Sequence, residues 1–402
     1  MNIMENHNGM KKKDSRNDMG KIKKLSINAS LLAGSILFAL IILEVSLRFM
    51  IHKERFIGGD LPKDYIILDN VIGHDISKNC PVSVFKFKDS GHDIWSNELG
   101  CFDKPYKGEK DYIFLAGDSF VWGFTPFESK WGTVLEEQTG TRVLKCSSLG
   151  YGITHEYLKM KKTIDMVHNT PSLIVVAYFV GNDLLDDHLF GTPPVPKKKV
   201  LNIKIWLTDN SIVYNILKQS ESLRSIGRKI GVVEETLILP NQYPLSENSV
   251  PWLKEAWKKQ TKAIQDIKSY SDKIGTKLFV VIIPTREQVY EFLRPQVKNV
   301  DWTFLNKKVG SFLEKEKIGY LDLLPLLEQY ANKSPRKSLD AKNDLYWKYD
   351  GHWNIKGNRL AGLIVSKNIL ENNLIKVKDR EEKLQKIESL LSNFKNEGSS
   401  ND

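Results

Sequence analysis

Short apolar runs alternate with segments of helical periodicity from residue 111 onward, and this alternation restricts the fold more than any other feature of the sequence. The strongest run, 173–180 (LIVVAYFV), is entirely apolar, which is typical of a strand buried on both faces of a parallel sheet. We expect strands at 112–116, 142–146, 173–180, 277–283 and 320–323, and helices at 128–139, 154–168, 252–274, 300–317 and 355–370. Five strands separated by helices predict an α/β, doubly wound parallel sheet, in which functional residues lie at the carboxyl ends of the strands.

A long apolar stretch precedes this part of the chain. Residues 27–43 are nearly all apolar, and with 45–51 they reach the roughly 20 residues that a membrane-spanning helix needs. The first 25 residues contain seven basic side chains: Lys11, Lys12, Lys13, Arg16, Lys21, Lys23 and Lys24. This bias favours an uncleaved signal anchor with a cytoplasmic N-terminus and the remainder of the chain outside the cytoplasm. A cleaved signal peptide and a buried helix of a soluble protein are the alternatives.

Composition and charge exclude several classes of protein. Apolar residues make up 41% and charged residues 27% of the 402 residues, which excludes collagen, a wholly disordered chain and a membrane protein with many spans. The formal net charge of +10 is partly concentrated in the N-terminal tail, so we expect no nucleic-acid partner. The membrane itself is the expected partner of the anchor.

The sequence divides into five segments. We expect a basic cytoplasmic tail, a transmembrane anchor, an irregular N-terminal extension, a catalytic domain with a helical insertion or lid, and a charged flexible tail. Their ranges are 1–25, 26–51, 52–110, 111–372 with the insertion at 184–250, and 373–402. Within the extension, 82–87 is strand-like, and within the insertion, 211–229 has the pattern of a helix.

Three cysteines are too few for the disulfide framework of a small secreted domain. Outside the cytoplasm Cys80 and Cys101 are near enough in sequence to pair, whereas Cys146 falls in an expected buried strand and is interpreted as a small core residue. Three free thiols are an equally open alternative. The sequence contains no cluster of Cys and His at zinc spacing, so we expect no metal and no cofactor.

Three polar loops follow the first three expected strands. Ser119 comes directly after the first strand in Ala-Gly-Asp-Ser, Gly150 follows the second, and Asn182 follows the third. A serine in such a tight turn is exposed for nucleophilic attack, although Gly-Asp-Ser is also ordinary turn sequence. The backbone N–H groups of Ser119 and Gly150 and the amide of Asn182 are three donors of the kind that stabilise a tetrahedral oxyanion.

The candidate base is His352, which lies between the last expected strand and the last helix. Asp350 precedes it by two residues and is expected to orient its imidazole through Nδ1, which leaves Nε2 for the serine. Asn354 is expected to cap the following helix and so to fix this loop. Asp344, upstream in the same loop, is the competing carboxylate if Asp350 only caps a turn.

These blocks together resemble the SGNH (GDSL-like) hydrolase superfamily. Residues 116–119, 149–152, 181–183 and 350–354 are similar to its four sequence blocks, and the resemblance covers about 111–370 without the insertion. It implies a flavodoxin-like sheet and ester chemistry. The last block is Asp-x-His rather than Asp-x-x-His, because Tyr349 stands at the usual Asp position, and this short form is similar to the alginate O-acetyltransferase-like branch. Residues 145–147 replace the Asn-x-Gly of the second block.

The resemblance and the residues lead to one expectation. We expect a membrane-anchored, extracytoplasmic serine esterase or O-acyltransferase in which Ser119 is the nucleophile, His352 the base and Asp350 its orienting carboxylate. Acyl esters, above all acetylated glycans of an envelope or exported polysaccharide, are the implied substrates, and polysaccharide-modifying machinery is the implied partner. The alternative is a non-catalytic carbohydrate-binding module on the same scaffold; a phosphodiesterase is disfavoured because the sequence has no phosphate-binding loop.

Overall fold

The structure is a computed structural model of the chain. It describes residues 61–191, 250–294, 300–334, 336 and 338–399, together with 24, 27, 28, 30–32, 34, 35, 37–46, 211, 213, 246 and 247. The chain divides into two compact units, one of residues 1–55 and 194–236 and one of residues 56–193 and 237–402. The second unit contains the sheet and all the candidate site residues.

A five-stranded parallel sheet forms the centre of this unit. Its strands are β5 (Tyr112–Ala116), β6 (Arg142–Lys145), β7 (Leu173–Phe179), β8 (Lys277–Ile283) and β9 (Gly319–Asp322). They are hydrogen-bonded in the order β6-β5-β7-β8-β9, and every neighbouring pair is parallel. The predicted strands and the doubly wound arrangement are confirmed. The chain order reverses between β5 and β7, which is where such sheets place their ligand-binding crevice.

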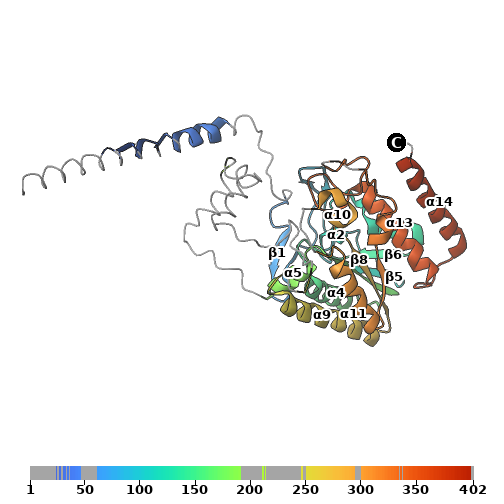
Figure 1. Ribbon diagram of the computed structural model, residues 1–402. Helices are drawn as coiled ribbons and strands as arrows, with labels where there is room; N and C mark the ends of the chain where they lie inside the picture. Colours follow the sequence, from blue (N-terminus) through green and yellow to red (C-terminus); the bar gives the residue numbers. More distant parts are fainter. Residues whose placement is uncertain are drawn as a thin grey trace, which may run out of the picture. The chain divides into compact units, whose positions relative to one another are not determined.

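Helices cover both faces of the sheet. The longer ones are α3 (Trp131–Thr139), α4 (Ile153–Val167), α9 (Leu253–Lys273), α11 (Phe304–Lys315), α13 (Ile355–Glu371) and α14 (Arg380–Ser399). Shorter turns are α2 (Ser119–Trp122), η1 (Phe127–Ser129), α5 (Asp183–Leu189), α10 (Arg286–Val289), η2 (Glu291–Leu293) and α12 (Leu324–Leu327). Figure 1 shows α4, α9 and α11 on one side of the sheet and α13 and α14 on the other.

Alternation of side chains along the strands explains the two layers. In β5, Ile113 and Leu115 pack in the core with α3 and α13, whereas Phe114 and Ala116 pack with α4 and α9. All five residues of β5 are buried, as a central parallel strand requires. The two cores hold the carboxyl ends of β5 and β7 in fixed positions.

The N-terminal extension is more ordered than its sequence suggested. It contains two antiparallel hairpins, β1 (Ile66–Asp69) with β2 (Gly73–Ile76) and β3 (Ser83–Lys86) with β4 (Gly91–Ile94). Its aromatic side chains pack against residues that follow β5; the rings of Phe85 and Trp122, for example, are 5.1 Å apart. The strand-like stretch expected at 82–87 corresponds to β3, and the rest of the extension is more ordered than expected because its aromatic side chains are buried.

The disulfide differs from the expected one. Cys101 is bonded to Cys146, with Cα atoms 4.7 Å apart, and Cys80 is a free, half-buried thiol. Cys146 directly follows β6, and the extension passes beside this strand, where Asp103 accepts a hydrogen bond from the backbone N–H of Lys145 at 2.9 Å. The partner of Cys101 is thus set by the docking of the extension on the sheet and not by distance along the chain.

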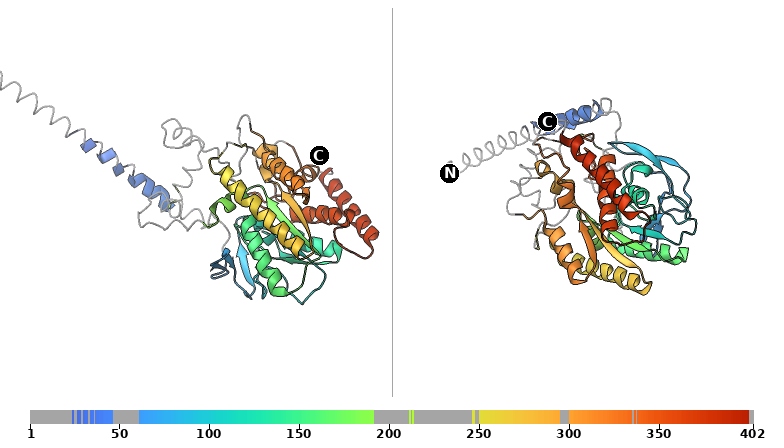
Figure 2. Two further views of the ribbon diagram at one scale, coloured as in Figure 1. Left: turned by 90° about the horizontal axis from the view of Figure 1, so that it is seen from below. Right: turned by 90° about the vertical axis from the view of Figure 1, so that its right-hand side faces the viewer.

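The C-terminal segment is also corrected. We expected residues 373–402 to be flexible, but α14 packs against α13 and α3. Ile387 and Leu391, four residues apart, are buried in the core beneath it. Figure 2 shows α13 and α14 lying against each other at the edge of the domain.

The other unit is described only in part. The residues described between 24 and 46 are helical, and their large apolar side chains are exposed, Leu31 by 65% and Phe38 by 65%. Among the described residues, no helix has the length and hydropathy of a membrane span. Most of the expected insertion, with the helix expected at 211–229, lies outside the described residues, and its first residues form α5.

Candidate active site

Ser119 lies at the carboxyl end of β5, where the chain turns directly into the short helix α2. Asp118 caps this helix: its Oδ1 accepts from the N–H of Phe120 at 2.9 Å, and its Oδ2 lies 3.1 Å from Ser119 Oγ. The turn is tight enough to require glycine at 117, since a Cβ there would lie 2.3 Å from the side chain of Val121. The geometry fixes the serine hydroxyl at the edge of the sheet.

Ser119, His352 and Asp350 form a continuous chain of hydrogen bonds. The distance from Ser119 Oγ to His352 Nε2 is 2.7 Å, and the distance from His352 Nδ1 to Asp350 Oδ1 is 2.5 Å. Asp350 Oδ1 also accepts from the backbone N–H of His352 at 2.8 Å. With the proton on Nδ1, the imidazole presents its unprotonated Nε2 to the serine, which is the tautomer that a general base requires.

Aromatic rings fix the plane of the imidazole. The ring of Phe124 stacks on His352 with centroids 3.9 Å apart and planes 9° apart, and Phe120 contacts the imidazole at 4.9 Å. Below the ring, Asn354 caps α13 by accepting from the N–H of Gly357 at 2.9 Å, as the sequence predicted. The base therefore has little rotational freedom.

Asp350 and not Asp344 contacts the imidazole. Burial by itself would raise the pKa of Asp350, but the neighbouring His352 and its hydrogen bonds outweigh burial and lower that pKa below its ordinary value. Asp344 is fully buried elsewhere, where it pairs with Arg336 and accepts from the N–H of Asp340 at 2.6 Å. The geometry thus selects the carboxylate of the short Asp-x-His motif.

A third carboxylate, Asp89, supports this loop from the tip of the β3–β4 hairpin. Its Oδ2 accepts from the N–H of Asp350 at 2.9 Å and from that of Tyr349 at 3.1 Å. Burial raises the pKa of Asp89. Sequence reasoning missed this residue, because a single Asp in a Lys-Asp-Ser turn carries no signal for a partner about 260 residues away.

Two of the expected oxyanion donors, Gly150 and Asn182, are not part of the hydrogen-bonded chain of Ser119, His352 and Asp350. Gly150 is exposed, with φ at +68° and open space where a Cβ would be, so its loop suits a close approach of substrate to the backbone. Asn182 lies at the start of α5, beyond β7, but its Nδ2 donates to Asp186 Oδ2 at 2.7 Å. The structure therefore brings Ser119, His352 and Asp350 together and leaves the amide of Asn182 directed to another side chain.

Several carboxyl groups with raised pKa values lie on α5 or close to it. Burial first, and then like charges on neighbouring carboxylates, raise the pKa of Asp186 to about 7. Burial also raises the pKa of Asp118 and of Asp187 to about 6, and the pKa of Glu156 well above its usual range. Within the part of the chain that the structure describes, no group of three or more His, Cys, Asp or Glu side chains is placed to hold a metal ion.

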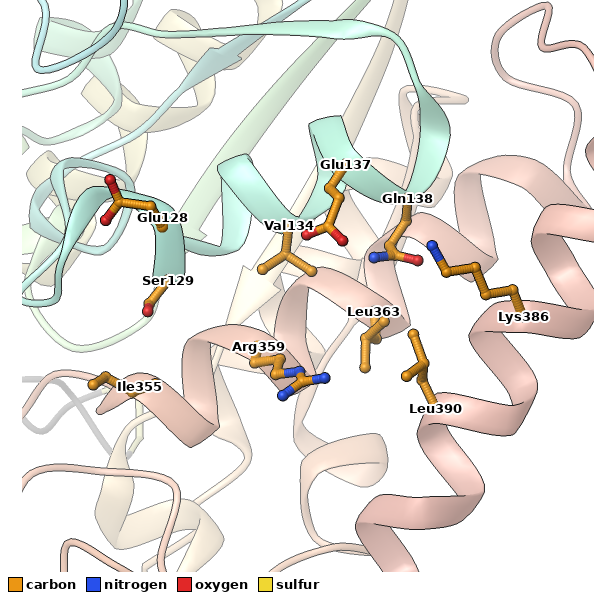
Figure 3. Close-up of a pocket in the computed structure, with 10 residues that line it drawn as sticks. All are labelled: Glu128, Ser129, Val134, Glu137, Gln138, Ile355, Arg359, Leu363, Lys386 and Leu390. Atoms are coloured by element: carbon orange, nitrogen blue, oxygen red, sulfur yellow. The ribbon is translucent and has the colours of Figure 1, made fainter.

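A cleft of about 320 Å³ lies between α3, α13 and α14. Figure 3 shows Arg359 and Leu363 of α13 facing Val134 and Glu137 of α3 across it. Its lining residues do not include the serine, the histidine or the aspartate of the hydrogen-bonded chain. The cleft is thus separate from the candidate catalytic residues.

The fold and the site define a serine–histidine–aspartate arrangement at the switch point of a doubly wound sheet. A comparison with protein-family models found no match, and a comparison with curated proteins found none either. Among solved structures, an acetyl xylan esterase is 13% identical with a TM-score of 0.37, covering 65% of this chain and 98% of its own. A GDSL-like lipase from Bacteroides thetaiotaomicron is 12% identical with a TM-score of 0.34, covering 67% and 92%.

A member of the lipolytic protein G-D-S-L family from Veillonella parvula is 12% identical with a TM-score of 0.34, covering 65% and 97%. Similarities at this level say nothing about the activity of this chain. The chemistry of the site is therefore interpreted from its own geometry.

Proposed function

We propose that this protein is a serine ester hydrolase or O-acyltransferase of the SGNH type. The observation that carries the proposal is the hydrogen-bonded chain from Ser119 Oγ through His352 to Asp350, at 2.7 Å and 2.5 Å. A separation above about 6 Å between the serine and the imidazole would have favoured a non-catalytic binding module, since a general base must reach the proton that it removes. The short distance favours catalysis.

The proposed reaction proceeds through an acyl-enzyme. Ser119 Oγ attacks the acyl carbonyl carbon while its proton passes to His352 Nε2, and Asp350 stabilises the imidazolium that forms. The tetrahedral intermediate expels the alcohol, which takes the proton back from Nε2. Water or a sugar hydroxyl then attacks the acyl-serine by the same proton transfers, releasing the free acid or a new ester.

Three donors are proposed to stabilise the oxyanion: the N–H groups of Ser119 and Gly150 and the side-chain amide of Asn182. Each such donor is worth about 3 kcal/mol of transition-state stabilisation. The first two are backbone groups on loops at the carboxyl edge of the sheet. The amide nitrogen of Asn182 carries two N–H groups, one of which donates to Asp186 Oδ2 at 2.7 Å.

We propose acylated glycans of an envelope or exported polysaccharide as the substrates. The short Asp-x-His motif, similar to the alginate O-acetyltransferase-like branch, supports this class. The proposed membrane anchor supports it as well, because an anchored enzyme outside the cytoplasm works where such polymers are assembled. Whether water or a glycan hydroxyl is the acceptor is decided by product analysis.

The proposed location is outside the cytoplasm, with the apolar stretch at 27–51 as the anchor. The basic N-terminal tail and the disulfide Cys101–Cys146 support it, since disulfides persist in oxidising compartments. A reporter enzyme that is active only outside the cytoplasm, fused after residue 60, should be active. Activity of a reporter that requires the cytoplasm would contradict this location.

Ester hydrolysis by the purified full-length chain tests the proposed function. Acetate release from p-nitrophenyl acetate and from a panel of acetylated glycans should fall by several orders of magnitude in Ser119→Ala, with an unchanged circular dichroism spectrum. Mixed incubations with acetyl donor and unacetylated glycan distinguish a transferase from a hydrolase. Equal hydrolysis by Ser119→Ala and the wild type would end the proposal.

A further inference from the structure

One residue of the N-terminal extension, His74 on β2, binds the loop that carries Gly150. The distance from His74 Nε2 to the backbone oxygen of Leu149 is 2.7 Å. A carbonyl oxygen only accepts hydrogen bonds, so Nε2 must carry a proton, which it donates. On the other side of Gly150, Tyr151 Oη donates to the backbone oxygen of His74 at 2.9 Å. Both neighbours of Gly150 are therefore bound to the same residue of the β1–β2 hairpin.

The oxygen that His74 binds and the N–H of Gly150 belong to one peptide group. The peptide bond is trans, so its C=O and N–H point in opposite directions. A donor on the oxygen thus sets the direction of the N–H, which faces away from His74. This N–H has no hydrogen-bond partner among the residues that the structure describes. The imidazole also makes it a stronger donor, since hydrogen bonds in a chain polarise one another.

This peptide group lies next to the candidate catalytic residues. β5 and β6 are neighbours in the sheet, and Ser119 and Gly150 lie on the loops at their carboxyl ends. The side chain of Leu149 packs against the aromatic cluster that contains Phe124, whose ring stacks on His352. The hairpin therefore holds a loop that borders the serine and the base.

We propose that His74 is a positioning residue for the oxyanion donor at Gly150: its Nε2–H holds the Leu149–Gly150 peptide group in the orientation that donates to the oxyanion. The inference rests on the proposed function, because Gly150 is one of its three donors. Glycine resists rotation of the adjoining peptide group less than any other residue, so an external restraint is needed to fix this N–H. The extension, which precedes the catalytic domain in sequence, thereby takes part in catalysis.

The imidazole also has a packing role, which the experiment must separate from positioning. Its ring lies edge-on to Tyr151, with centroids 5.1 Å apart, and 5.6 Å from the ring of His155. His74→Phe keeps a ring at this place but has no N–H to donate. His74→Gln loses the ring but keeps an NH₂ group for the oxygen of Leu149. The two variants thus remove the hydrogen bond and the ring contacts separately.

The first measurement is the kinetics of the full-length chain on p-nitrophenyl acetate. His74→Phe should lower kcat by about 10-fold to 100-fold with KM little changed, which is less than the 10²-fold to 10³-fold cost of removing a donor outright. His74→Gln should be at least about fivefold faster than His74→Phe, because its donor restores part of the restraint. If the phenyl ring prevents folding, His74→Leu replaces it with the same expectation.

Inhibition by methylboronic acid is the second measurement. This compound forms a tetrahedral adduct with a serine hydroxyl, in which a boron-bound oxygen takes the place of the oxyanion. Its inhibition constant should rise in His74→Phe by about the factor by which kcat/KM falls, since both report binding of the tetrahedral species. A merely structural residue would lower the free energy of unfolding in urea and leave this inhibition constant unchanged.

Asp69→Ala is the matched control, because it weakens the same hairpin without touching Leu149. Asp69 Oδ1 accepts from the N–H groups of Val71 and Ile72, both at 2.9 Å, and Oδ2 lies 2.8 Å from Lys162 Nζ. This variant should be less stable to urea and keep the kcat of the wild type. A loss of kcat equal to that of His74→Phe would overturn the assignment to the imidazole.

Two further results would refute the inference: wild-type kcat in His74→Phe, or equal losses in His74→Phe and His74→Gln, with Ser119→Ala inactive in either case. Activity that persists in Ser119→Ala would instead refute the proposed function on which the inference rests.

Discussion

Replacement of Asp350 by asparagine tests the carboxylate that the structure assigns to the base. Asp350 Oδ1 accepts both the Nδ1 proton and the backbone N–H of His352, at 2.5 Å and 2.8 Å. The introduced asparagine removes the negative charge that stabilises the imidazolium, and with its NH₂ group at the position of Oδ1 it would donate to Nδ1 and lose the hydrogen bond from the backbone N–H. The imidazole would then carry its proton on Nε2, where it cannot accept the proton of Ser119.

The expected loss is large because the wrong tautomer disables the base. The same substitution in a serine protease triad lowers kcat by about 10⁴, which corresponds to about 5.4 kcal/mol of transition-state stabilisation. We expect Asp350→Asn to reduce kcat for p-nitrophenyl acetate at neutral pH by about this factor, with KM little changed. Circular dichroism should show that the variant is folded.

Asp344→Asn is the matched control for this prediction. Asp344 is fully buried and paired with Arg336, so its replacement should lower the free energy of unfolding and leave kcat within a few-fold of the wild type. A large loss of kcat only in Asp344→Asn would refute the assignment of Asp350. Small losses in both variants would mean that His352 works with Ser119 as a dyad.

Three other perturbations test further parts of the structure. Asn182→Ala should reduce kcat near neutral pH by no more than about 10²-fold to 10³-fold, because the backbone donors remain; a loss as large as that of Ser119→Ala would contradict its role as one donor of three. Asp89→Ala should lower kcat by about 10-fold to 100-fold by releasing the loop that carries Asp350, and Asp89→Asn should recover part of the loss; unchanged kinetics in both would show that the hairpin does not position the loop. Reduction of Cys101–Cys146, which closes a loop of 45 residues, should lower the free energy of unfolding in urea by about 4 kcal/mol, whereas no change on adding reductant would contradict this bond.

The sheet and its order could be predicted because the signals are local. The residues of β5 and β7 form uninterrupted apolar runs, and parallel strands with intervening helices permit few topologies. Ser119, Asp350 and His352 were also foreseeable, because each directly follows a strand or precedes a helix. Their catalytic roles remain predictions, which only kinetics can test.

The parts that were predicted wrongly depend on contacts between distant residues. The pairing of Cys101 follows from where the extension lies against β6, which the spacing of cysteines does not encode. The helix α14 is rich in charged residues, and its apolar side chains are buried only through contact with other helices: Ile387 and Leu391 are buried, and Leu384, Leu390 and Phe394 are partly buried. Asp89 has no local signal, because its function arises from two N–H groups in a remote loop.

The acyl-enzyme itself gives the most direct test of the central claim. The full-length chain would be mixed with p-nitrophenyl acetate, quenched in acid during the first turnovers, digested, and its peptides analysed by mass spectrometry. We predict one acetyl group on the peptide containing Ser119, at Ser119 itself, and none in Ser119→Ala. An acetyl group on another residue, or turnover of the ester with Ser119 never acylated, would contradict this prediction.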